Sequence, residues 1–259
     1  MEKSTESEVK LVIINPQPDR IIRELSEIDN LAGYRILPVK VTELYDYYFD
    51  TPMAHLRADH LSLRVRFQDS KKFLTLKGKT RFTDWGGISR IEIEMPWNKK
   101  NFNYMMQKFP ASLDLSEPYN YLPDDPVKTL KSAGFIVIQA RRTRRITRNV
   151  LNRAKSGNPV AELALDQVDY NLYRQRLSHF EIEIEEREYG IRPVQEIMTD
   201  ILKTYGDSLM SWSISKLALG IILKKMEEKN QIQKKMTESG HLTAAAYQWI
   251  LENVTDFRK

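Results

Sequence analysis

Hydrophobic and polar residues alternate along several segments of the chain, which is the pattern of a β-strand with one buried face. The clearest example is the segment 181–185, in which three glutamates alternate with two isoleucines. Similar alternation, or enrichment in β-branched and aromatic residues, is typical of strands. It predicts eight of them, at residues 6–14, 39–49, 61–67, 72–78, 88–97, 135–150, 160–173 and 177–187.

Other segments repeat their hydrophobic residues every three to four positions, which predicts amphipathic helices. The first follows Asp19, and two more are expected within 98–134. Further helices are predicted after Pro193, from Ser213 or Ser215 into the charged run 224–235, and over 242–254. Because strands and helices do not alternate strictly, a parallel doubly wound sheet is disfavoured. We predict an α+β fold: a closed eight-stranded antiparallel β-barrel with helices packed outside it.

The change from strand patterns to helix patterns also predicts the domain organisation. Residues 1–225 are expected to form one domain, with 98–134 as a helical insertion between strands. Residues 226–259 are expected to form a C-terminal helical extension. Binding of a partner by this extension and simple packing against the barrel both stay open at this point.

Composition and charge narrow the chemistry. None of the 259 residues is cysteine, which excludes a disulfide scaffold, a thiolate zinc site, an iron–sulfur cluster and a cysteine nucleophile. The net charge of +5 lacks the basic excess that is typical of nucleic-acid binders. The N-terminus has no apolar core of a signal peptide, and the longest apolar run, 217–223, is too short to span a bilayer. We therefore expect a cytoplasmic protein without a membrane or nucleic-acid partner.

Charged residues occupy one face of most predicted strands; Arg64 and Arg66, for example, alternate with Leu63 and Val65. A single face of this kind is ordinarily the solvated side of an antiparallel sheet. Like charges on one strand face repel each other, however, and the pattern recurs from strand to strand. We therefore favour a barrel whose charged faces line the lumen. Acidic groups there would suit Mg²⁺ or Mn²⁺, and basic groups would suit a phosphate chain.

Short motifs along these strands resemble those of one known family. The first is Glu6-Ser7-Glu8-Val9-Lys10, an ExExK motif. In the order of the family there follow Tyr48-Phe49-Asp50-Thr51-Pro52, Leu63-Arg64-Val65-Arg66, Thr75-Leu76-Lys77-Gly78, Arg90-Ile91-Glu92-Ile93-Glu94, Arg142-Thr143-Arg144, Glu162-Leu163-Ala164-Leu165-Asp166, Glu181-Ile182-Glu183-Ile184-Glu185 and Ser215-Lys216. Together these motifs resemble the CYTH domains of the triphosphate tunnel metalloenzymes.

The resemblance implies a β-tunnel that binds a triphosphate together with Mg²⁺ or Mn²⁺. The implied metal ligands are Glu6, Glu8, Glu181 and Glu183. The implied phosphate contacts are Lys10, Arg64, Arg66, Lys77, Arg142, Arg144 and Lys216. The implied catalytic residues, which would serve a second metal or position the water, are Lys10, Glu92, Glu94, Glu162 and Asp166. Arg142 stands where the family usually has lysine, and the adjacent Arg141 and Arg145 leave open which arginines of this run face inward.

The resemblance leads us to expect a metal-dependent hydrolase of small-molecule triphosphates, with inorganic triphosphate as the first choice. The alternatives are a class IV-like adenylate cyclase, a thiamine triphosphatase and, without turnover, a polyphosphate-binding module. The chain has no P-loop motif and no GxGxxG fingerprint. The histidines His55, His60, His179 and His241 share no ligand spacing and are expected to be ordinary side chains, although His179 precedes the acidic strand. The oligomeric state, monomer or homodimer, stays open.

Overall fold

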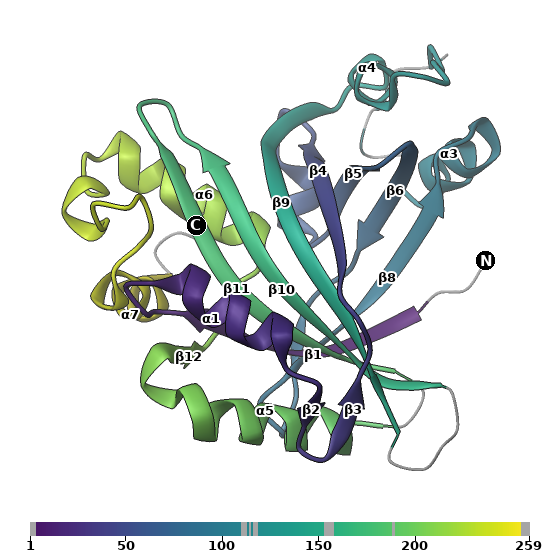
Figure 1. Cartoon of the computed structure of the whole chain (residues 1–259). Coiled ribbons are helices and arrows are strands. Elements are labelled where there is room, and N and C mark those ends of the chain that lie inside the picture. Colours follow the sequence, from purple (N-terminus) through teal and green to yellow (C-terminus); the bar gives the residue numbers. More distant parts are fainter. Residues whose placement is uncertain are drawn as a thin grey trace. The chain divides into compact units, whose positions relative to one another are not determined.

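The structure is a computed structural model, which describes residues 4–109, 113, 115, 119–152, 158–187 and 190–254. Its main strands are β1 (Ser4–Ile13), β4 (Lys40–Asp50), β5 (Ser62–Gln68), β6 (Lys71–Lys77), β8 (Ile88–Pro96), β9 (Ile136–Leu151), β10 (Pro159–Asn171) and β11 (Arg176–Glu186) (Figure 1). Hydrogen bonds connect them in the order β10-β11-β1-β8-β6-β5-β4-β9, and β9 also pairs with β10. This order closes on itself, which confirms the predicted eight-stranded antiparallel β-barrel.

Short strands that were not predicted extend this arrangement. They are β2 (Asn30–Leu31), β3 (Tyr34–Ile36), β7 (Arg81–Phe82) and β12 (Leu209–Ser211). Two or three residues are too few to show alternation, so these strands are defined by the partners with which they pair, as β12 is by β1.

The helices are α1 (Pro18–Glu27), α2 (His55–Ala58), α3 (Lys99–Met106), α4 (Pro126–Ser132), α5 (Arg192–Tyr205), α6 (Lys216–Glu228) and α7 (Ala244–Asn253). Side chains cap several of them: Ser215 accepts from the backbone N–H of Ala218 at the start of α6, and Thr243 does the same for α7. Such caps satisfy an N–H group that the helix itself leaves free. None of the helices in the described part of the chain has the length and apolar composition of a membrane span.

The chain groups into two compact units. Unit 1 draws on Met1–Glu6, Glu43–Arg81 and Ser89–Arg142, and unit 2 draws on Ser7–Thr42, Phe82–Ile88 and Thr143–Lys259. Strands β1, β4, β7, β8 and β9 contribute residues to both units.

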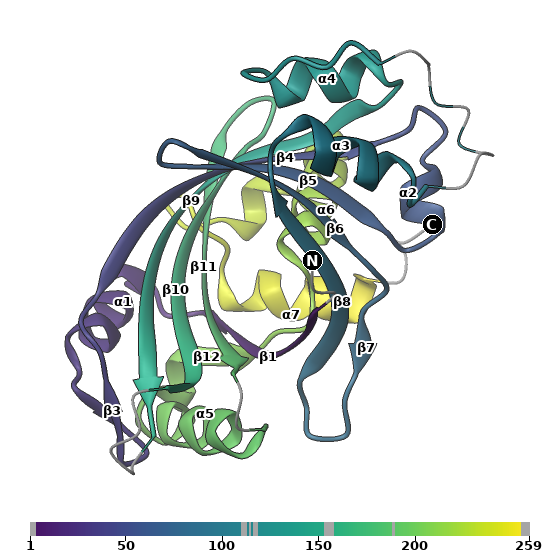
Figure 2. The same ribbon diagram turned by 90° about the vertical axis from the view of Figure 1, so that its right-hand side faces the viewer.

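In unit 1, strands β4, β5, β6 and β8 pair in antiparallel register (Figure 2). Alternation puts Leu63 and Val65 of β5 and Leu74 of β6 on one face, where they are fully buried. Helix α3 packs into the same hydrophobic cluster through Phe102 and Met105. The residues between the apolar ones, which include most of the charged residues of these strands, point to the opposite face.

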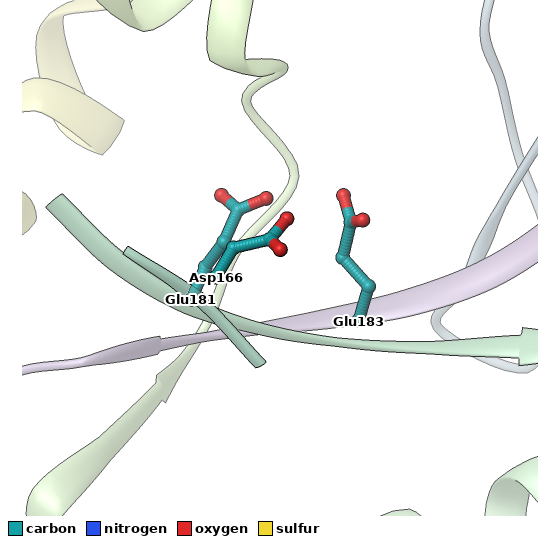
Figure 3. A group of neighbouring side chains, drawn as sticks. All are labelled: Asp166, Glu181 and Glu183. Carbon is teal, nitrogen blue, oxygen red and sulfur yellow. The ribbon is translucent and has the colours of Figure 1, made fainter. Parts of the chain in front are cut away.

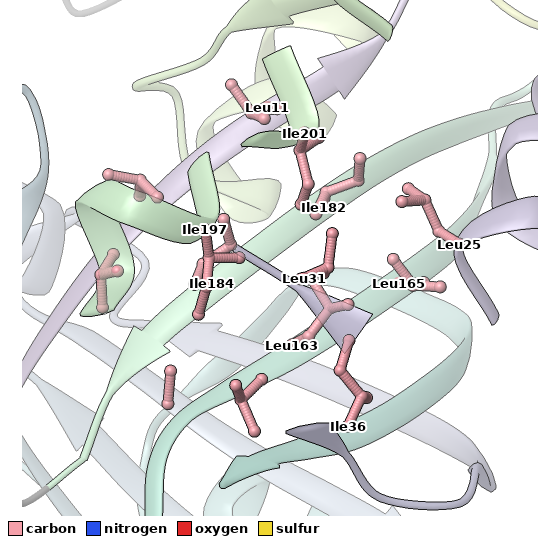
Figure 4. Close-up of a cluster of buried hydrophobic side chains, with 14 of the residues drawn as sticks. Leu11, Leu25, Leu31, Ile36, Leu163, Leu165, Ile182, Ile184, Ile197 and Ile201 are labelled. Carbon is pink, nitrogen blue, oxygen red and sulfur yellow. The ribbon is translucent and has the colours of Figure 1, made fainter. Parts of the chain in front are cut away.

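Unit 2 has two hydrophobic clusters on opposite faces of β1, β10 and β11. On one face, Leu11, Leu163 and Ile184 pack against residues of α1 and α5 (Figure 4). On the other face, Val12 and Val168 pack with residues of α6 and α7. Strand positions two apart share a face. Helices α6 and α7 therefore lie on the sheet face that carries the charged residues further along the same strands.

Candidate functional site

Unit 1 carries a group of charged side chains on the face opposite its hydrophobic core. This unit 1 cluster consists of Glu6, Asp46, Arg64, Arg66, Lys77, Arg90, Glu92, Glu94 and Arg141. Strand register brings its members together, because Asp46 lies opposite Arg66 and Lys77 lies opposite Glu92. Five cations and four carboxylates thus form one network of ion pairs.

Asp46 anchors three arginines of this cluster. Its carboxylate, in a residue only 1% exposed, accepts hydrogen bonds from Arg66 Nε (2.7 Å) and Nη2 (2.9 Å) and from Arg141 Nη2 (3.1 Å), and Arg64 Nη1 lies 3.9 Å away. Burial by itself would raise the pKa of Asp46, but the arginine charges hold this pKa well below its usual range. Asp46 is therefore an ionised group that fixes the direction of the guanidinium groups around it. Arg141 also donates to Tyr48 Oη at 2.5 Å.

Lys77 lies between two carboxylates. Its Nζ is 2.5 Å from Glu92 and 3.0 Å from Glu6, and Arg90 Nε is 3.2 Å from Glu6. Burial and a hydrogen bond with Glu6 raise the pKa of Glu92 to about 7. Burial acts in the same direction on Glu6, but the hydrogen bond from Glu92 and the two neighbouring cations hold the pKa of Glu6 below its usual range. Near neutral pH, Glu92 is therefore partly protonated, and its protonated form donates a hydrogen bond to the ionised Glu6.

Arg64 and Glu94 complete the unit 1 cluster. Arg64 Nη2 donates to Glu94 Oε2 at 3.0 Å and to the hydroxyl of Thr75 at 3.2 Å, and this hydroxyl donates to the same Glu94 oxygen at 2.8 Å. The side chain of Glu94 is 38% exposed, which makes it the carboxylate of this cluster that is most open to water.

Unit 2 carries a second charged group. This unit 2 cluster consists of Glu8, Lys10, Arg145, Glu162, Asp166, Glu181, Glu183, Glu185, Arg187 and Lys216. In the strand register, Glu183 lies between Lys10 on β1 and Ala164 on β10, and Glu181 lies opposite Asp166. The unit 2 cluster thus contains six carboxylates and four cations, most of them on this face of the sheet.

Three carboxylates at the centre of the unit 2 cluster form an acidic triad, Asp166, Glu181 and Glu183. Each offers one oxygen, and these oxygens lie within 4.8 Å of one another. Figure 3 shows the three side chains on the same side of their strands. Carboxylate oxygens are the hard ligands that Mg²⁺ and Mn²⁺ prefer, so the donor set fits such an ion.

Lys216 and Arg145 compensate the acidic triad. Lys216 Nζ lies 2.7 Å from Glu183 and 3.0 Å from Asp166, and it also contacts Glu181. Arg145 donates to both oxygens of Asp166 (2.8 and 2.6 Å) and to one of Glu183 (2.5 Å). Burial alone would favour the neutral form of each group, but the ion pairs raise the pKa values of the two cations and lower those of the three carboxyls. The acidic triad therefore stays ionised at neutral pH.

Strand alternation places the arginines of β9 on two different faces. Arg142 and Arg144 lie on the exposed face of β9, and Arg142 donates to Glu43 at 2.8 Å with its side chain 45% exposed. Arg141 and Arg145 lie on the opposite face, where each joins a charged cluster. The arginines of this run that join the charged clusters are therefore Arg141 and Arg145, and contact of Arg142 and Arg144 with phosphate stays a prediction.

The other sequence-predicted residues divide between the two clusters. Unit 1 contains Glu6, Arg64, Arg66, Lys77, Glu92 and Glu94, and unit 2 contains Glu8, Lys10, Glu162, Asp166, Glu181, Glu183 and Lys216. Asp46 belongs to none of the motifs that the sequence shows. An aspartate inside a strand rich in aromatic residues is unusual and is the one signal that pointed to it.

Comparisons with known proteins agree with this architecture. No curated protein matches the chain. Among solved structures, the Hippeastrum protein HpAC1, described as a candidate adenylyl cyclase with a dominant triphosphatase activity, has a TM-score of 0.55 and 21% identity, covering 86% of this chain and 96% of that chain. This likeness establishes a shared fold.

Two further structures are less similar. A candidate adenylate cyclase of Bacillus halodurans has a TM-score of 0.47 and 17% identity, covering 82% of this chain and 96% of that chain. The S. pombe RNA triphosphatase Pct1 has a TM-score of 0.37 and 12% identity, covering 99% of this chain and 87% of that chain. The family model of the CYTH domain matches residues 4–209, which is most of the chain, and the chain therefore belongs to the CYTH domain family.

Proposed function

We propose that this chain is a divalent-metal-dependent triphosphatase whose substrate is inorganic triphosphate. The observation that carries the proposal is the acidic triad, whose ionised oxygens lie within 4.8 Å of one another beside Lys216 and Arg145. A Mg²⁺ or Mn²⁺ ion held by Asp166, Glu181 and Glu183 would neutralise charge on phosphate oxygens. Membership in the CYTH family and the triphosphatase activity described for the Hippeastrum protein support the same chemistry.

In unit 2, we assign phosphate contacts to Lys216 and Lys10. Lys216 is the first residue of α6, which the Ser215 cap fixes in place, and its ammonium group already lies among the triad carboxylates. An ammonium group has three N–H donors, so it can bind a phosphate oxygen and keep a carboxylate partner. Lys10 lies opposite Glu183 on β1, and its Nζ donates to the carbonyl of Ile214 at 3.2 Å.

In unit 1, we assign phosphate contacts to Arg64, Arg66, Lys77 and Arg141. Guanidinium groups bind phosphate through two parallel N–H donors, and the pairing with Asp46 fixes the plane of each group before any substrate binds. Such preorganisation suits phosphoryl transfer, in which positioning and charge neutralisation supply most of the rate enhancement.

The unit 1 carboxylates are proposed to act on the attacking water. Glu94 is the most exposed of them and can orient a water molecule, while Glu92, with its pKa of about 7, can take up or release a proton at neutral pH. The assignment of Glu6 and Glu8 as metal ligands stays a prediction. Glu6 is paired with Lys77 and Arg90 in unit 1, and Glu8 lies opposite Glu185 in unit 2.

A substrate panel tests the proposal. The chain is incubated with inorganic triphosphate, ATP, thiamine triphosphate or long-chain polyphosphate, each with Mg²⁺ or Mn²⁺, and orthophosphate, pyrophosphate and cyclic AMP are measured. We expect the fastest orthophosphate release from inorganic triphosphate and none after chelation of the metal. The variant Glu183→Gln should be inactive, and the matched control Glu228→Gln, on the exposed side of α6, should be fully active.

Each alternative has its own outcome. Cyclic AMP and pyrophosphate from ATP would identify a cyclase, and fastest turnover of thiamine triphosphate would identify a thiamine triphosphatase. Binding of polyphosphate without turnover of any substrate would identify a binding module and refute the enzymatic proposal.

A further inference from the structure

His179 lies beside the acidic triad, two positions before Glu181 on β11. Its Nε2 is 2.7 Å from Glu181 Oε2, and its Nδ1 is 2.9 Å from the hydroxyl of Tyr247 on α7. His179 and Glu181 are 0% exposed and Tyr247 is 1% exposed, so water does not compete for these contacts. Both ring nitrogens are thus engaged, whereas the sequence predicts an ordinary side chain at this position.

The charge of Glu181 sets the direction of its hydrogen bond with His179. The ionised carboxylate of Glu181 can only accept, so His179 Nε2 carries a proton and donates it. The Tyr247 hydroxyl and His179 Nδ1 form the second hydrogen bond, and burial raises the pKa of Tyr247 well above its usual value, so the hydroxyl keeps its proton. The result is one relay of hydrogen bonds that runs from Tyr247 through His179 to Glu181.

Aromatic packing fixes the imidazole in this orientation. The ring centroids of Tyr247, Trp212 and Tyr170 lie 5.6, 6.0 and 6.5 Å from that of His179. All three aromatic residues belong to the hydrophobic cluster that α6 and α7 form on this face of unit 2. Aromatic contacts and two hydrogen bonds together therefore fix the position of the His179 ring.

We propose that His179 and Tyr247 are positioning residues that hold the Glu181 carboxylate in the orientation that binds the divalent ion, an inference that rests on the proposed function of the acidic triad. One oxygen of Glu181 is engaged by His179, and the other contacts Lys216. Without the His179 contact, the carboxylate is free to turn fully toward Lys216. Helix α7 lies beyond the family-matched residues 4–209, so the relay makes this C-terminal helix part of the site.

Titration of the full-length chain with Mn²⁺ in the absence of substrate, followed by calorimetry, tests the relay. Tyr247→Phe removes only the hydroxyl and should weaken Mn²⁺ binding by about 10-fold, since hydrogen bonds to metal ligands typically change affinity 10–100-fold. The matched control is Tyr34→Phe, which removes a hydroxyl that donates to Glu196 at 2.6 Å elsewhere in unit 2. It should leave Mn²⁺ affinity unchanged.

A double-variant cycle distinguishes a relay from simple packing. His179→Leu should weaken Mn²⁺ binding at least as much as Tyr247→Phe, and the double variant should bind no more weakly than His179→Leu alone, because both changes break one chain. Additive losses would overturn the relay. The ¹⁵N shifts of His179 give a readout that needs no metal: a proton on Nε2 is expected, and Tyr247→Phe should move the Nδ1 signal.

Failure of the relay and failure of the proposed function have different signatures. If the wild type binds Mn²⁺, Glu181→Gln does not, and Tyr247→Phe binds like the wild type, the relay alone is overturned. If the wild type does not bind Mn²⁺, the metal role of the acidic triad is lost and the relay proposal is lost with it.

Discussion

The unit 1 and unit 2 clusters use the same residue types on the same kind of strand face, yet their charges are unbalanced in opposite directions. In unit 1, five cations meet four carboxylates, and Glu92 is only partly ionised at neutral pH because its pKa is about 7. In unit 2, six carboxylates meet four cations. The net charge of +5 conceals this contrast. Unit 1 is suited to anions and unit 2 to a cation.

The anchors of the two clusters are also opposite in sign. A buried carboxylate, Asp46, holds the arginines of unit 1, whereas buried cations, Lys216 and Arg145, hold the carboxylates of unit 2. Burying charges is expensive, and replacing a buried ion pair by apolar residues is often neutral or stabilising. Stability alone therefore does not account for two such networks in one chain, whereas the proposed binding of a metal ion and a phosphate chain gives each of them a role.

The largest effect is expected from removing one charge of the acidic triad. Glu183→Gln keeps the shape of the side chain, but it leaves Lys216 and Arg145 in excess over the remaining carboxylates. We expect metal-dependent turnover of triphosphate to fall by about 10²-fold or more, as when an electrostatic group is removed from an active site. If turnover stayed within about twofold of the wild type, the acidic triad would not be the cation-binding group that distinguishes unit 2 from unit 1.

Removing the unit 1 anchor should act on stability. Asp46→Asn leaves three arginines without their shared carboxylate, and we expect a loss of about 3 kcal/mol in the free energy of unfolding at pH 7, measured with urea. Asp124→Asn is the matched control, because Asp124 is fully exposed and its pair with Lys72 contributes about 0–1 kcal/mol.

The pH dependence of this loss has a definite sign. The pKa of Asp46 is lower in the folded chain than its ordinary 3.8, so below that pH the unfolded chain binds more protons. Ionised Asp46 therefore contributes to the free energy of unfolding above pH 3.8, and this contribution is lost as the pH falls toward the pKa of Asp46 in the folded chain. The gap between wild type and Asp46→Asn should therefore narrow below pH 3.8, and a constant gap would show that Asp46 is not an ionised anchor.

Alternation of charged and apolar residues determines which parts of this architecture can be predicted from the sequence. Segments such as 63–66 and 181–185 carry charged and apolar residues in strict turn, so both the strand and its charged face can be assigned from sequence. In the run from Arg141 to Arg145, four of the five residues are arginine, so alternation does not show which of them share the charged face. Which of them face the clusters depends on where β9 pairs with its neighbours, and this is a property of the fold.

The relay from Tyr247 to Glu181 lay outside the reach of sequence reasoning for a related reason. Tyr247 and His179 are 68 positions apart, and neither belongs to a recognisable motif. Tertiary packing of α7 against the β11 face brings them together. Sequence motifs thus predict the charged residues themselves but not the buried groups that orient them.

A matched pair of substitutions tests which face of β9 contributes to triphosphate binding. Arg141→Lys keeps the charge but removes the planar donor that contacts Asp46 and Tyr48. We expect the KM for triphosphate to rise about 10-fold, since a hydrogen bond to a charged group is worth about 1.5–3 kcal/mol. Arg142→Lys, on the exposed face, should leave KM unchanged. The reverse result would restore the sequence-based choice of Arg142.

The smallest effect is expected at the edge of the unit 2 cluster, where Arg187 donates to Glu162 at 2.6 Å and the side chains are 35% and 20% exposed. Pairs this accessible to water contribute about 0–1 kcal/mol, so Glu162→Gln should lower the unfolding free energy by less than about 1 kcal/mol. Calorimetry should also find Mn²⁺ affinity within about twofold of the wild type, unlike Glu183→Gln, because Arg187 already occupies the Glu162 carboxylate. A loss of Mn²⁺ affinity as large as that of Glu183→Gln would instead support the catalytic role that the sequence predicts for Glu162. The proposed metal site of unit 2 would then extend from the acidic triad to Glu162, which lies opposite Glu185 in the strand register.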